Sequence, residues 1–263
     1  MPEFIEYEVS NHVAVITLNR PEVMNALNRQ MYGELEQAFR DAHKDPEVRC
    51  VVLTGNGRSF CSGDDVRAIM LGGERDQTVT RLRDAAPKPT PAAVAVLECD
   101  KPVIVAVNGA AVGWGMDLTL FGDIRIASEG AKFGELFIKR GLVADLGGLW
   151  RLPRVVGPSK AAELLFTGDI ISAQEAERIG LVSKVVSPEE LLPTAMEMAS
   201  KIAANPPIAL RYMKEGLRRS VHGSMEEMGE YVGNSLAYLF TTEDHKEGAT
   251  SFVERREPVF KGR

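Results

Sequence analysis

Hydrophobic and polar positions divide the first part of the chain into short segments with different periods. Residues 4–9 and 12–19 alternate or run apolar on either side of a polar Ser-Asn pair, which predicts the two strands of a hairpin. From Asn28 onward, apolar residues recur every three or four positions, which predicts one face of a helix. Residues 48–54 predict the next strand, because this apolar run ends in the turn-forming sequence GNG.

The same alternation of strands and helices continues through the middle of the chain. The predicted strands are residues 102–107, 124–127 and 180–186, and the predicted helices are residues 116–121, 158–166 and 173–179. Beyond residue 188 the pattern is helical, with long amphipathic segments at 189–204, 207–219 and 224–240. This shift predicts an α/β core over residues 1–190 and a helical region over residues 191–263, packed as a bundle or used as a subunit interface.

Glycines separate the predicted strand 102–107 from the predicted helix 116–121. Gly109, Gly113 and Gly115 lie between the two elements, where a missing Cβ lets another molecule approach the backbone. The N–H groups at a helix N-terminus carry the positive end of the helix dipole. Such a site can hold an oxygen that becomes negatively charged during a reaction. Asp117 lies within the first turn of this helix, so the segment indicates chemistry rather than packing.

A polar stretch over residues 72–92 has no counterpart elsewhere in the chain. It opens with the charged sequence GGERD and closes with PKPTP. The stretch is either a solvated surface loop or a mobile lid over a pocket, because long loops in compact domains often cover binding sites.

Composition limits the classes of function that fit the chain. The 263 residues carry a net charge of −6, which argues against general nucleic-acid binding. Cys50, Cys61 and Cys99 lack metal-ligand spacing, so reduced intracellular thiols are the simplest interpretation. The longest uncharged run, residues 102–116, is shorter than the roughly 20 residues that span a membrane. We therefore expect a cytoplasmic protein without a metal or a tightly bound redox cofactor.

Four motifs, in this order and spacing, resemble the crotonase superfamily, also called the enoyl-CoA hydratase/isomerase family, over nearly the whole chain. They are VITLNRP at 15–21 with NALN at 25–28, FCSGDD at 60–65, NGAAVGWGMD at 108–117, and LPR at 152–154 with VG at 156–157, LFTG at 165–168 and IGLV at 179–182. The resemblance implies an α/β fold in which ββα turns form a right-handed spiral. It also implies a helical C-terminal trimerisation region, homotrimers or dimers of trimers, and a coenzyme A thioester as substrate, with no separate cofactor.

The resemblance also assigns the groups that hold the substrate. It implies that the backbone N–H groups of Asp64 and Trp114 form an oxyanion hole for the thioester oxygen. The Trp114 indole is then either a pocket wall or a core aromatic. The further residues expected to contact substrate or coenzyme A are Ala26, Ser62, Gly63, Asp65, Val66, Gly113 and Phe137. For Asp65 a helix-capping role is the favoured interpretation, because it precedes a predicted helix.

The family's two hydratase glutamates have no exact counterparts in this chain. The first position is occupied by Asp117 and the second by Phe137, which cannot transfer a proton. Glu135 would lie on the same side as Phe137 if the stretch were extended, so it is a possible substitute with a shifted register. Asp117 is either a second acid or a helix-start carboxylate that orients the substrate.

Asp145 is the leading candidate for the proton-transfer group. Its position, eight residues after Phe137, carries a catalytic aspartate in the dienoyl-CoA isomerases and in ring-opening isomerases of phenylacetyl-CoA catabolism. A helix-capping role for Asp145 is compatible with this one. A single carboxylate that removes a proton at one carbon and returns it at another suffices to move a double bond.

Other functions fit the same residues less well. A hydratase or dehydratase using Asp117 and Asp145 is the nearest alternative, and a non-catalytic CoA-binding relative is another. A dehalogenase or carbon–carbon bond hydrolase is disfavoured, because no histidine lies between His43 and His222. A dinucleotide-binding turn is also disfavoured, because the glycine spacing lacks the third glycine of that motif.

Overall fold

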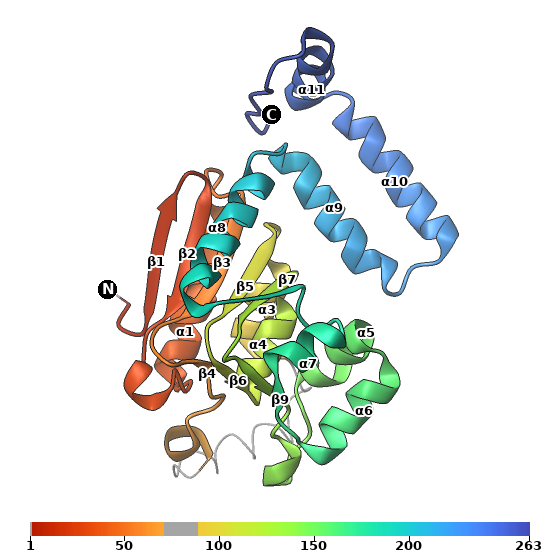
Figure 1. Ribbon diagram of the computed structural model, residues 1–263. Coiled ribbons are helices and arrows are strands. Elements are labelled where there is room, and N and C mark those ends of the chain that lie inside the picture. Colours follow the sequence, from red (N-terminus) through yellow and green to blue (C-terminus); the bar gives the residue numbers. More distant parts are fainter. Residues whose placement is uncertain (1, 71–88) are drawn as a thin grey trace.

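Two β-sheets form the framework of the protein, and the computed structural model describes residues 2–70 and 89–263 (Figure 1). Most of the predicted loop 72–92 therefore lies outside the described residues. The larger sheet has the order β1-β2-β3-β5-β7-β10. Its strands are β1 (Ile5–Ser10), β2 (Val13–Leu18), β3 (Cys50–Gly55), β5 (Val103–Val107), β7 (Ile124–Ser128) and β10 (Lys184–Val186). Strands β1 and β2 form the predicted antiparallel hairpin, and the other neighbours are parallel.

The smaller sheet has the order β4-β6-β8-β9. Its strands are β4 (Ser59–Cys61), β6 (Ala110–Val112), β8 (Lys132–Gly134) and β9 (Ile171–Ser172). Successive strands of the chain alternate between the sheets: β3 is followed by β4, β5 by β6 and β7 by β8. The first strand of each pair lies in the larger sheet and the second in the smaller one. Helices then return the chain to the larger sheet. This repeated ββα path confirms the spiral that the sequence resemblance implied.

Four helices of the core form close to where the sequence pattern predicted them, and two others were not predicted. Helix α1 (Arg29–Lys44) begins after Asn28, whose side chain accepts the Met31 N–H at 2.8 Å and so caps the helix. The face that α1 buries carries the residues spaced by three and four, among them Leu35 and Phe39. The other helices of the core are α3 (Pro91–Glu98), α4 (Trp114–Phe121), α5 (Leu152–Val156), α6 (Pro158–Thr167) and α7 (Ala173–Arg178). Of these helices, α1, α4, α6 and α7 were predicted, whereas α3 and α5 were not. Short turns are η1 (Pro21–Val23), η2 (Val66–Met70), η3 (Ile138–Arg140) and η4 (Gly147–Arg151).

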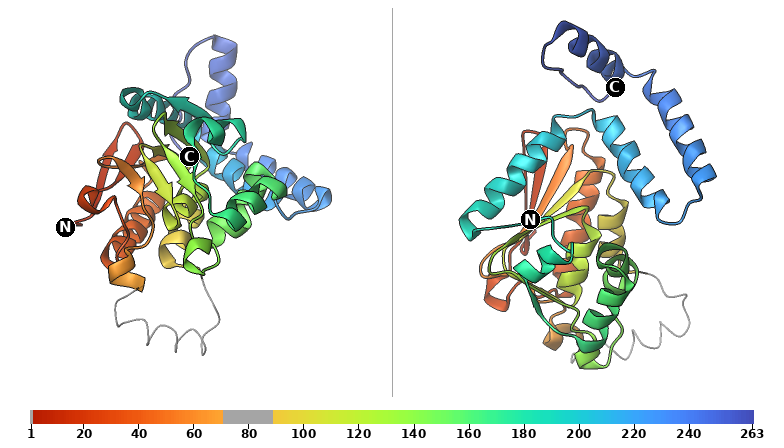
Figure 2. Two further views of the ribbon diagram at one scale, coloured as in Figure 1. Left: turned by 60° about the horizontal axis from the view of Figure 1, so that its bottom comes forward. Right: turned by 45° about the vertical axis from the view of Figure 1, so that its right-hand side comes forward.

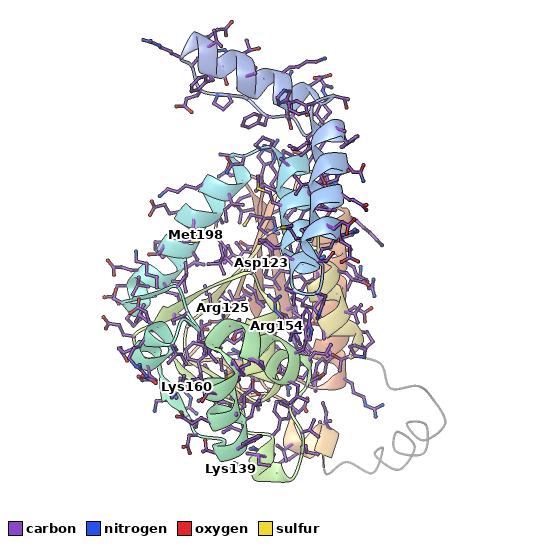
Figure 3. All side chains as sticks on the ribbon, turned by 90° about the vertical axis from the view of Figure 1, so that its right-hand side faces the viewer. Asp123, Arg125, Lys139, Arg154, Lys160 and Met198 are labelled. Carbon is purple, nitrogen blue, oxygen red and sulfur yellow. The ribbon has the colours of Figure 1, made fainter. Side chains whose placement is uncertain are left out.

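Helix α4 is the central element for the site, and all of its residues are buried. It follows the predicted glycine segment directly, between β6 and β7. The buried Arg125 of β7, labelled in Figure 3, secures the C-terminal end of this helix. Its guanidinium donates hydrogen bonds to the carbonyls of Thr119, Gly122 and Leu181. These bonds tie α4 to the segment that leads into β10.

The C-terminal helices divide into one that covers the core and three that extend from it. Helix α8 (Pro188–Ala203) packs on the larger sheet through Leu191, Ala195 and Ala199. Helices α9 (Pro207–Ser220), α10 (Met225–Leu239) and α11 (Glu243–Glu254) extend away from the sheets, and Figure 2 shows this from two further sides. The sequence predicted three of these helices but not α11. The domain boundary at residue 190 stays a prediction.

Buried charges attach α9 to the core. The Lys214 ammonium group is 5% exposed and lies 2.7 Å from the Asp123 carboxylate, which also accepts the Val103 N–H. Lys214 donates a second bond to the Lys101 carbonyl. Across residues 2–70 and 89–263, none of the helices is long and apolar enough to cross a membrane.

Candidate active site

Two peptide N–H groups from different turns of the spiral border one small cavity. The N–H of Asp64 follows β4, and the N–H of Trp114 opens α4. Within the described ranges, neither N–H donates a backbone or side-chain hydrogen bond. Both residues line a cavity of about 30 Å³. Two unpartnered donors at one cavity are what a developing oxyanion requires.

Glycines bring these two backbone segments together. Gly63 has φ +85°, and a Cβ there would lie 2.9 Å from the Val112 carbonyl oxygen and 3.2 Å from the Trp114 nitrogen. Gly113 has φ +56°, a left-handed conformation that favours glycine. The turn before α4 and the end of β4 can therefore approach only because Gly63 lacks a side chain, while glycine at position 113 allows the turn its positive φ.

The cavity collects most of the residues that were expected to contact substrate. Its lining is Ser62, Gly63, Asp64, Val66, Gly113, Trp114, Leu136, Phe137 and Arg140. Ala26 and Asp65 lie outside this lining. Asp65 instead accepts the Ala68 N–H at 3.2 Å, as the capping interpretation predicted, and pairs with Arg20 at 3.5 Å. Arg140 and Leu136 also line the cavity, although no sequence motif pointed to them.

Asp145 lies outside the lining of the cavity, and two hydrogen bonds fix its carboxylate next to Trp114, which does line it. Its Oδ2 accepts the indole N–H of Trp114 at 3.2 Å, and its Oδ1 accepts the N–H of Leu146 at 2.7 Å. The residue is only partly exposed. The second bond joins neighbouring residues and is not a helix cap, so the predicted capping role of Asp145 is not observed at η4. Together the two bonds give the carboxylate a defined orientation.

Aromatic contacts fix the indole that holds Asp145. Trp114 is 3% exposed and packs edge-on against Tyr32 at 4.8 Å and Phe121 at 5.8 Å between ring centroids. The Tyr32 hydroxyl donates to Asp64 Oδ1 at 2.6 Å. Burial raises the pKa of Tyr32 well above its usual value, so this hydroxyl keeps its proton. A continuous chain of contacts thus joins Asp64, Tyr32, Trp114 and Asp145.

Asp117 and Glu135 lie behind the cavity rather than in its wall. They are 0% and 1% exposed, and none of their carboxyl oxygens accepts a hydrogen bond from a described residue. Burial is the main cause that raises the pKa of each carboxyl well above its usual value, and the charge of Asp145 adds to both. Because its oxygens accept no bond of regular geometry, Asp117 does not cap α4.

Phe137 and Glu135 do not share one side, contrary to the extended geometry considered for this stretch. Strand β8 ends at Gly134, and Phe137 has helical dihedrals of φ −58° and ψ −44° just before η3. The turn directs Phe137 to the cavity, while Glu135 packs against Gly148 inside the protein. Apolar Phe137 therefore borders the cavity at the position of the second hydratase glutamate.

The cysteine beside the site is not a nucleophile. Cys61 is fully buried at the end of β4, and burial raises the pKa of its thiol to about 12. The thiolate is the reactive form of cysteine, so this side chain is inert at neutral pH.

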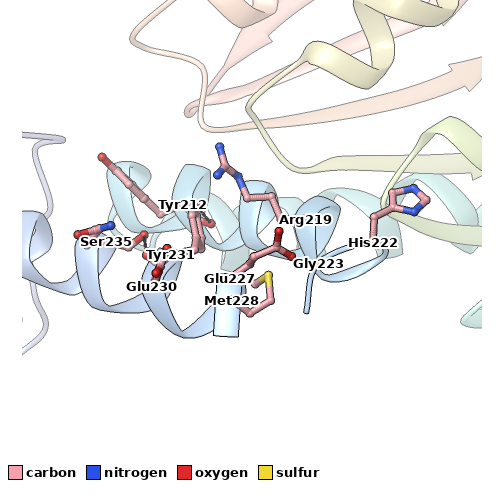
Figure 4. A pocket seen from close by; sticks show the side chains of 10 residues that line it. Tyr212, Arg219, His222, Gly223, Glu227, Met228, Glu230, Tyr231 and Ser235 are labelled. Carbon is pink, nitrogen blue, oxygen red and sulfur yellow. Dashed lines mark hydrogen bonds between the residues drawn. The ribbon is translucent and has the colours of Figure 1, made fainter. Parts of the chain in front are cut away.

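A larger groove lies away from this chemistry, between α9 and α10 (Figure 4). It measures about 700 Å³, and Tyr212, Arg219 and Tyr231 are among its lining residues. The Arg219 guanidinium lies 4.8 Å from the centre of the Tyr231 ring. The groove contains no residue of the glycine segment or of the carboxyl cluster.

Comparison with known proteins places the chain in a family. Residues 8–263 match the family described as Enoyl-CoA hydratase/isomerase. The chain is 40% identical to the (E)-benzylidenesuccinyl-CoA hydratase of Thauera aromatica, covering 98% of this chain and 99% of the relative. It is 35% identical to the 1,2-epoxyphenylacetyl-CoA isomerase of Escherichia coli, covering 100% of both.

A solved structure agrees with these sequence matches. The crystal structure of enoyl-CoA hydratase from Bacillus anthracis superposes with a TM-score of 0.91 at 34% identity, covering 99% of this chain and 100% of that one. Relatives of similar closeness are thus named as hydratases and as isomerases. The chain belongs to the enoyl-CoA hydratase/isomerase family of the crotonase superfamily, whose members act on acyl-CoA thioesters.

Proposed function

We propose that this enzyme shifts a double bond in an acyl-CoA thioester, with Asp145 as its single proton shuttle. The observation that carries the proposal is the hydrogen bond from the Trp114 indole to Asp145, 3.2 Å long, beside the two unpartnered N–H groups. Phe137 lines the cavity where a second hydratase carboxyl would be expected, and the lining carboxyl of Asp64 accepts the Tyr32 hydroxyl. One oriented carboxylate next to an oxyanion site is sufficient for isomerisation.

The reaction begins when the N–H groups of Asp64 and Trp114 bind the thioester oxygen. Asp145 then removes a proton from a carbon in conjugation with the thioester, and the electrons move into an enolate. The two N–H groups stabilise the negative oxygen, and each such donor is worth roughly 10²–10³ in rate. Asp145 returns the proton to another carbon of the conjugated system. No proton is gained or lost overall.

The acyl-CoA contacts follow the cavity lining. We assign Ser62, Gly63, Val66, Gly113 and Phe137 to the substrate, since all of them border the cavity. The other two proposed contacts, Ala26 and Asp65, lie beside Arg20, which donates to the Ala26 carbonyl at 2.6 Å and pairs with Asp65. They would act at the outer part of the thioester.

The test compares products from one 3-enoyl-CoA and one 2-enoyl-CoA. Wild-type enzyme should convert the 3-enoyl thioester to the 2-enoyl thioester without forming a hydrated product. Asp145→Asn should lose this conversion by about 10²-fold or more. The matched control is Asp169→Asn, which makes the same change at an exposed position. Full activity in Asp145→Asn would overturn the assignment.

A hydratase that uses Asp117 and Asp145 is the second candidate. It is favoured by the proximity of the two acids, since the charge of Asp145 raises the pKa of Asp117. A protonated acid beside an ionised one could add water across a double bond. Hydrated product from the 2-enoyl thioester, lost in both Asp117→Asn and Asp145→Asn, would establish this reaction instead. No turnover of either thioester by any variant would favour a non-catalytic CoA-binding protein.

We further propose that the C-terminal helices join copies of the chain into a homotrimer or a dimer of trimers. Apolar side chains remain exposed on α9, α10 and α11, including Leu217, Leu236, Phe252 and Val253. Exposed apolar surface of this kind typically marks an interface between proteins. Sedimentation equilibrium should give three or six times the chain mass. A monomer at micromolar concentration would contradict this assembly.

A further inference from the structure

Tyr32 contacts both residues whose backbone N–H groups border the cavity. Its hydroxyl donates a hydrogen bond to Asp64 Oδ1 at 2.6 Å. Its ring packs edge-on against the Trp114 indole, with 4.8 Å between the ring centroids and 80° between the planes. Tyr32 lies near the start of α1 and is not part of the cavity lining. It would therefore act on a substrate through Asp64 and Trp114.

Backbone hydrogen bonds to Leu27 orient the Asp64 N–H. The Leu27 N–H donates to the Gly63 carbonyl at 2.8 Å, and the Asp65 N–H donates to the Leu27 carbonyl at 2.9 Å. In a planar trans peptide the C=O and the N–H point in opposite directions. Because the Gly63 carbonyl points at Leu27, the N–H of the same peptide unit, which belongs to Asp64, points away from it. The segment that leads into α1 thus orients the first donor.

The start of α4 orients the Trp114 N–H in a similar way. The Gly113 carbonyl accepts the N–H groups of Met116 at 2.9 Å and Asp117 at 3.1 Å. The N–H of the same peptide unit belongs to Trp114 and therefore points out from the start of the helix. These bonds orient each donor within its own segment, but they do not join the two segments.

Strand pairing joins the two segments only as far as the turns. Strands β4 and β6 are neighbours in the smaller sheet, and their last paired residues are Cys61 and Ala111. Asp64 and Trp114 each lie three residues beyond this pairing. Tyr32 contacts the side chains of both, so its hydroxyl and its ring bridge the two turns beside the donors.

We propose that Tyr32 is a positioning residue that sets the spacing of the two oxyanion donors, because its hydroxyl holds Asp64 while its ring holds Trp114. This role rests on the proposed function of the two N–H groups, and it applies to an isomerase and to a hydratase alike. The same contact reaches Asp145, because the Trp114 indole donates to that carboxylate at 3.2 Å. One side chain thus connects the groups that stabilise the enolate with the group that moves the proton.

The carbonyl stretch of a bound thioester tests the spacing directly. Butyryl-CoA labelled with ¹³C at its thioester carbonyl has no double bond to shift, so isotope-edited infrared difference spectra report binding without turnover. Two aligned N–H donors polarise the C=O bond, so the band in the wild type should lie at lower frequency than in water. In Tyr32→Phe the band should lie closer to that of the free ligand, because the hydroxyl is lost while the ring remains. The same band position in both proteins would overturn the proposal.

Steady-state kinetics supply a second readout. Tyr32→Phe should lower kcat by about tenfold and change KM less than about twofold, because oxyanion donors bind the transition state more tightly than the substrate. Tyr32→Leu loses the ring as well, so its kcat should fall by about 10²-fold. The control Tyr7→Phe removes the hydroxyl of a tyrosine on β1 that borders a different groove, and it should match the wild type in kcat and band position. Wild-type kcat in Tyr32→Leu would contradict the role.

A double-mutant cycle separates the hydroxyl–carboxylate bond from general packing. If the hydroxyl acts by holding Asp64, Tyr32→Phe should lower kcat little further once Asp64→Ala has removed the carboxylate. Losses that multiply would show that the two side chains act independently, and the proposal would fail.

The infrared measurement also distinguishes this role from the proposed reaction. A shifted wild-type band without isomerisation would reject the isomerase assignment and leave the role of Tyr32 in place. An unshifted wild-type band would reject the oxyanion site and the role of Tyr32 together.

Discussion

The indole nitrogen of Trp114 donates a hydrogen bond to Asp145 Oδ2 at 3.2 Å. The same residue presents an unpartnered backbone N–H at the cavity, so its main chain and its side chain serve different groups. Tyr32 and Phe121 hold the indole from two sides. One side chain thereby sets the position of Asp145 relative to the backbone N–H of Trp114.

Trp114→Phe should lower kcat by about tenfold or more, because a hydrogen bond to a charged group contributes about 1.5–3 kcal/mol. The phenyl ring keeps most of the packing, and the backbone N–H remains, so KM should change little. Steady-state kinetics on the 3-enoyl thioester provide the measurement. Trp150→Phe is the control, since that indole bonds His222 outside the cavity. Equal kcat values for wild type and Trp114→Phe would remove the orienting role.

Gly63→Ala should push the backbone N–H groups of Asp64 and Trp114 apart. The new Cβ would lie 2.9 Å from the Val112 carbonyl, at a position whose φ of +85° is itself unfavourable for alanine. Displacing one donor should lower kcat by roughly 10²-fold. Gly180→Ala isolates the backbone effect, because its φ is +76° and no atom lies within 4 Å of the added Cβ. Comparable loss of kcat in both variants would show that strain, not donor geometry, is responsible.

The buried acids predict how stability depends on pH. The pKa of Asp117 and that of Glu135 are raised on folding, chiefly by burial, so the folded protein retains protons that the unfolded chain has lost above about pH 4. Their contribution is complete below that pH and is lost as pH rises through the raised pKa values. In urea unfolding, the free energy of unfolding of Asp117→Asn should therefore fall less steeply between about pH 4 and neutrality than that of the wild type. Parallel curves for the two proteins would refute this account.

Lys214→Met should weaken the attachment of α9. The ammonium group is 5% exposed and lies 2.7 Å from Asp123, so its removal leaves a carboxylate without its cation. We expect a loss of about 2 kcal/mol in the free energy of unfolding. Lys201→Met removes a cation that is 74% exposed in a pair at 2.6 Å, and should cost less than about 1 kcal/mol. Thermal unfolding distinguishes the two variants, and equal melting temperatures would contradict the prediction.

Periodicity along the chain was sufficient to predict most of the fold. The alternating residues before Asn19 and the helical spacing after Asn28 both report burial on one face, which is a local property. None of the four strands of the smaller sheet was predicted, because each has only two or three residues and is too short to show such a period. Helix α11 lies within the region predicted to be helical, but its own bounds were not predicted.

The site was harder to predict, because its contacts join distant segments. Motif spacing pointed to Asp64, Trp114 and Asp145. The hydrogen bond between Trp114 and Asp145 was not predicted, because it depends on the Trp114 side chain reaching from α4 to the segment just before η4. Tyr32 belongs to none of the motifs, and only the fold brings its hydroxyl to Asp64. The packing of Glu135 against Gly148 likewise depends on the turn after β8.

The central claim is that Asp145 alone moves the proton of a thioester enolate. In heavy water, the wild-type enzyme should exchange the acidic carbon-bound proton of a 3-enoyl-CoA for deuterium while forming the 2-enoyl thioester, as followed by mass spectrometry. Asp145→Asn should show neither exchange nor conversion, and Asp169→Asn should show both. Exchange or conversion at the wild-type rate in Asp145→Asn would contradict the account.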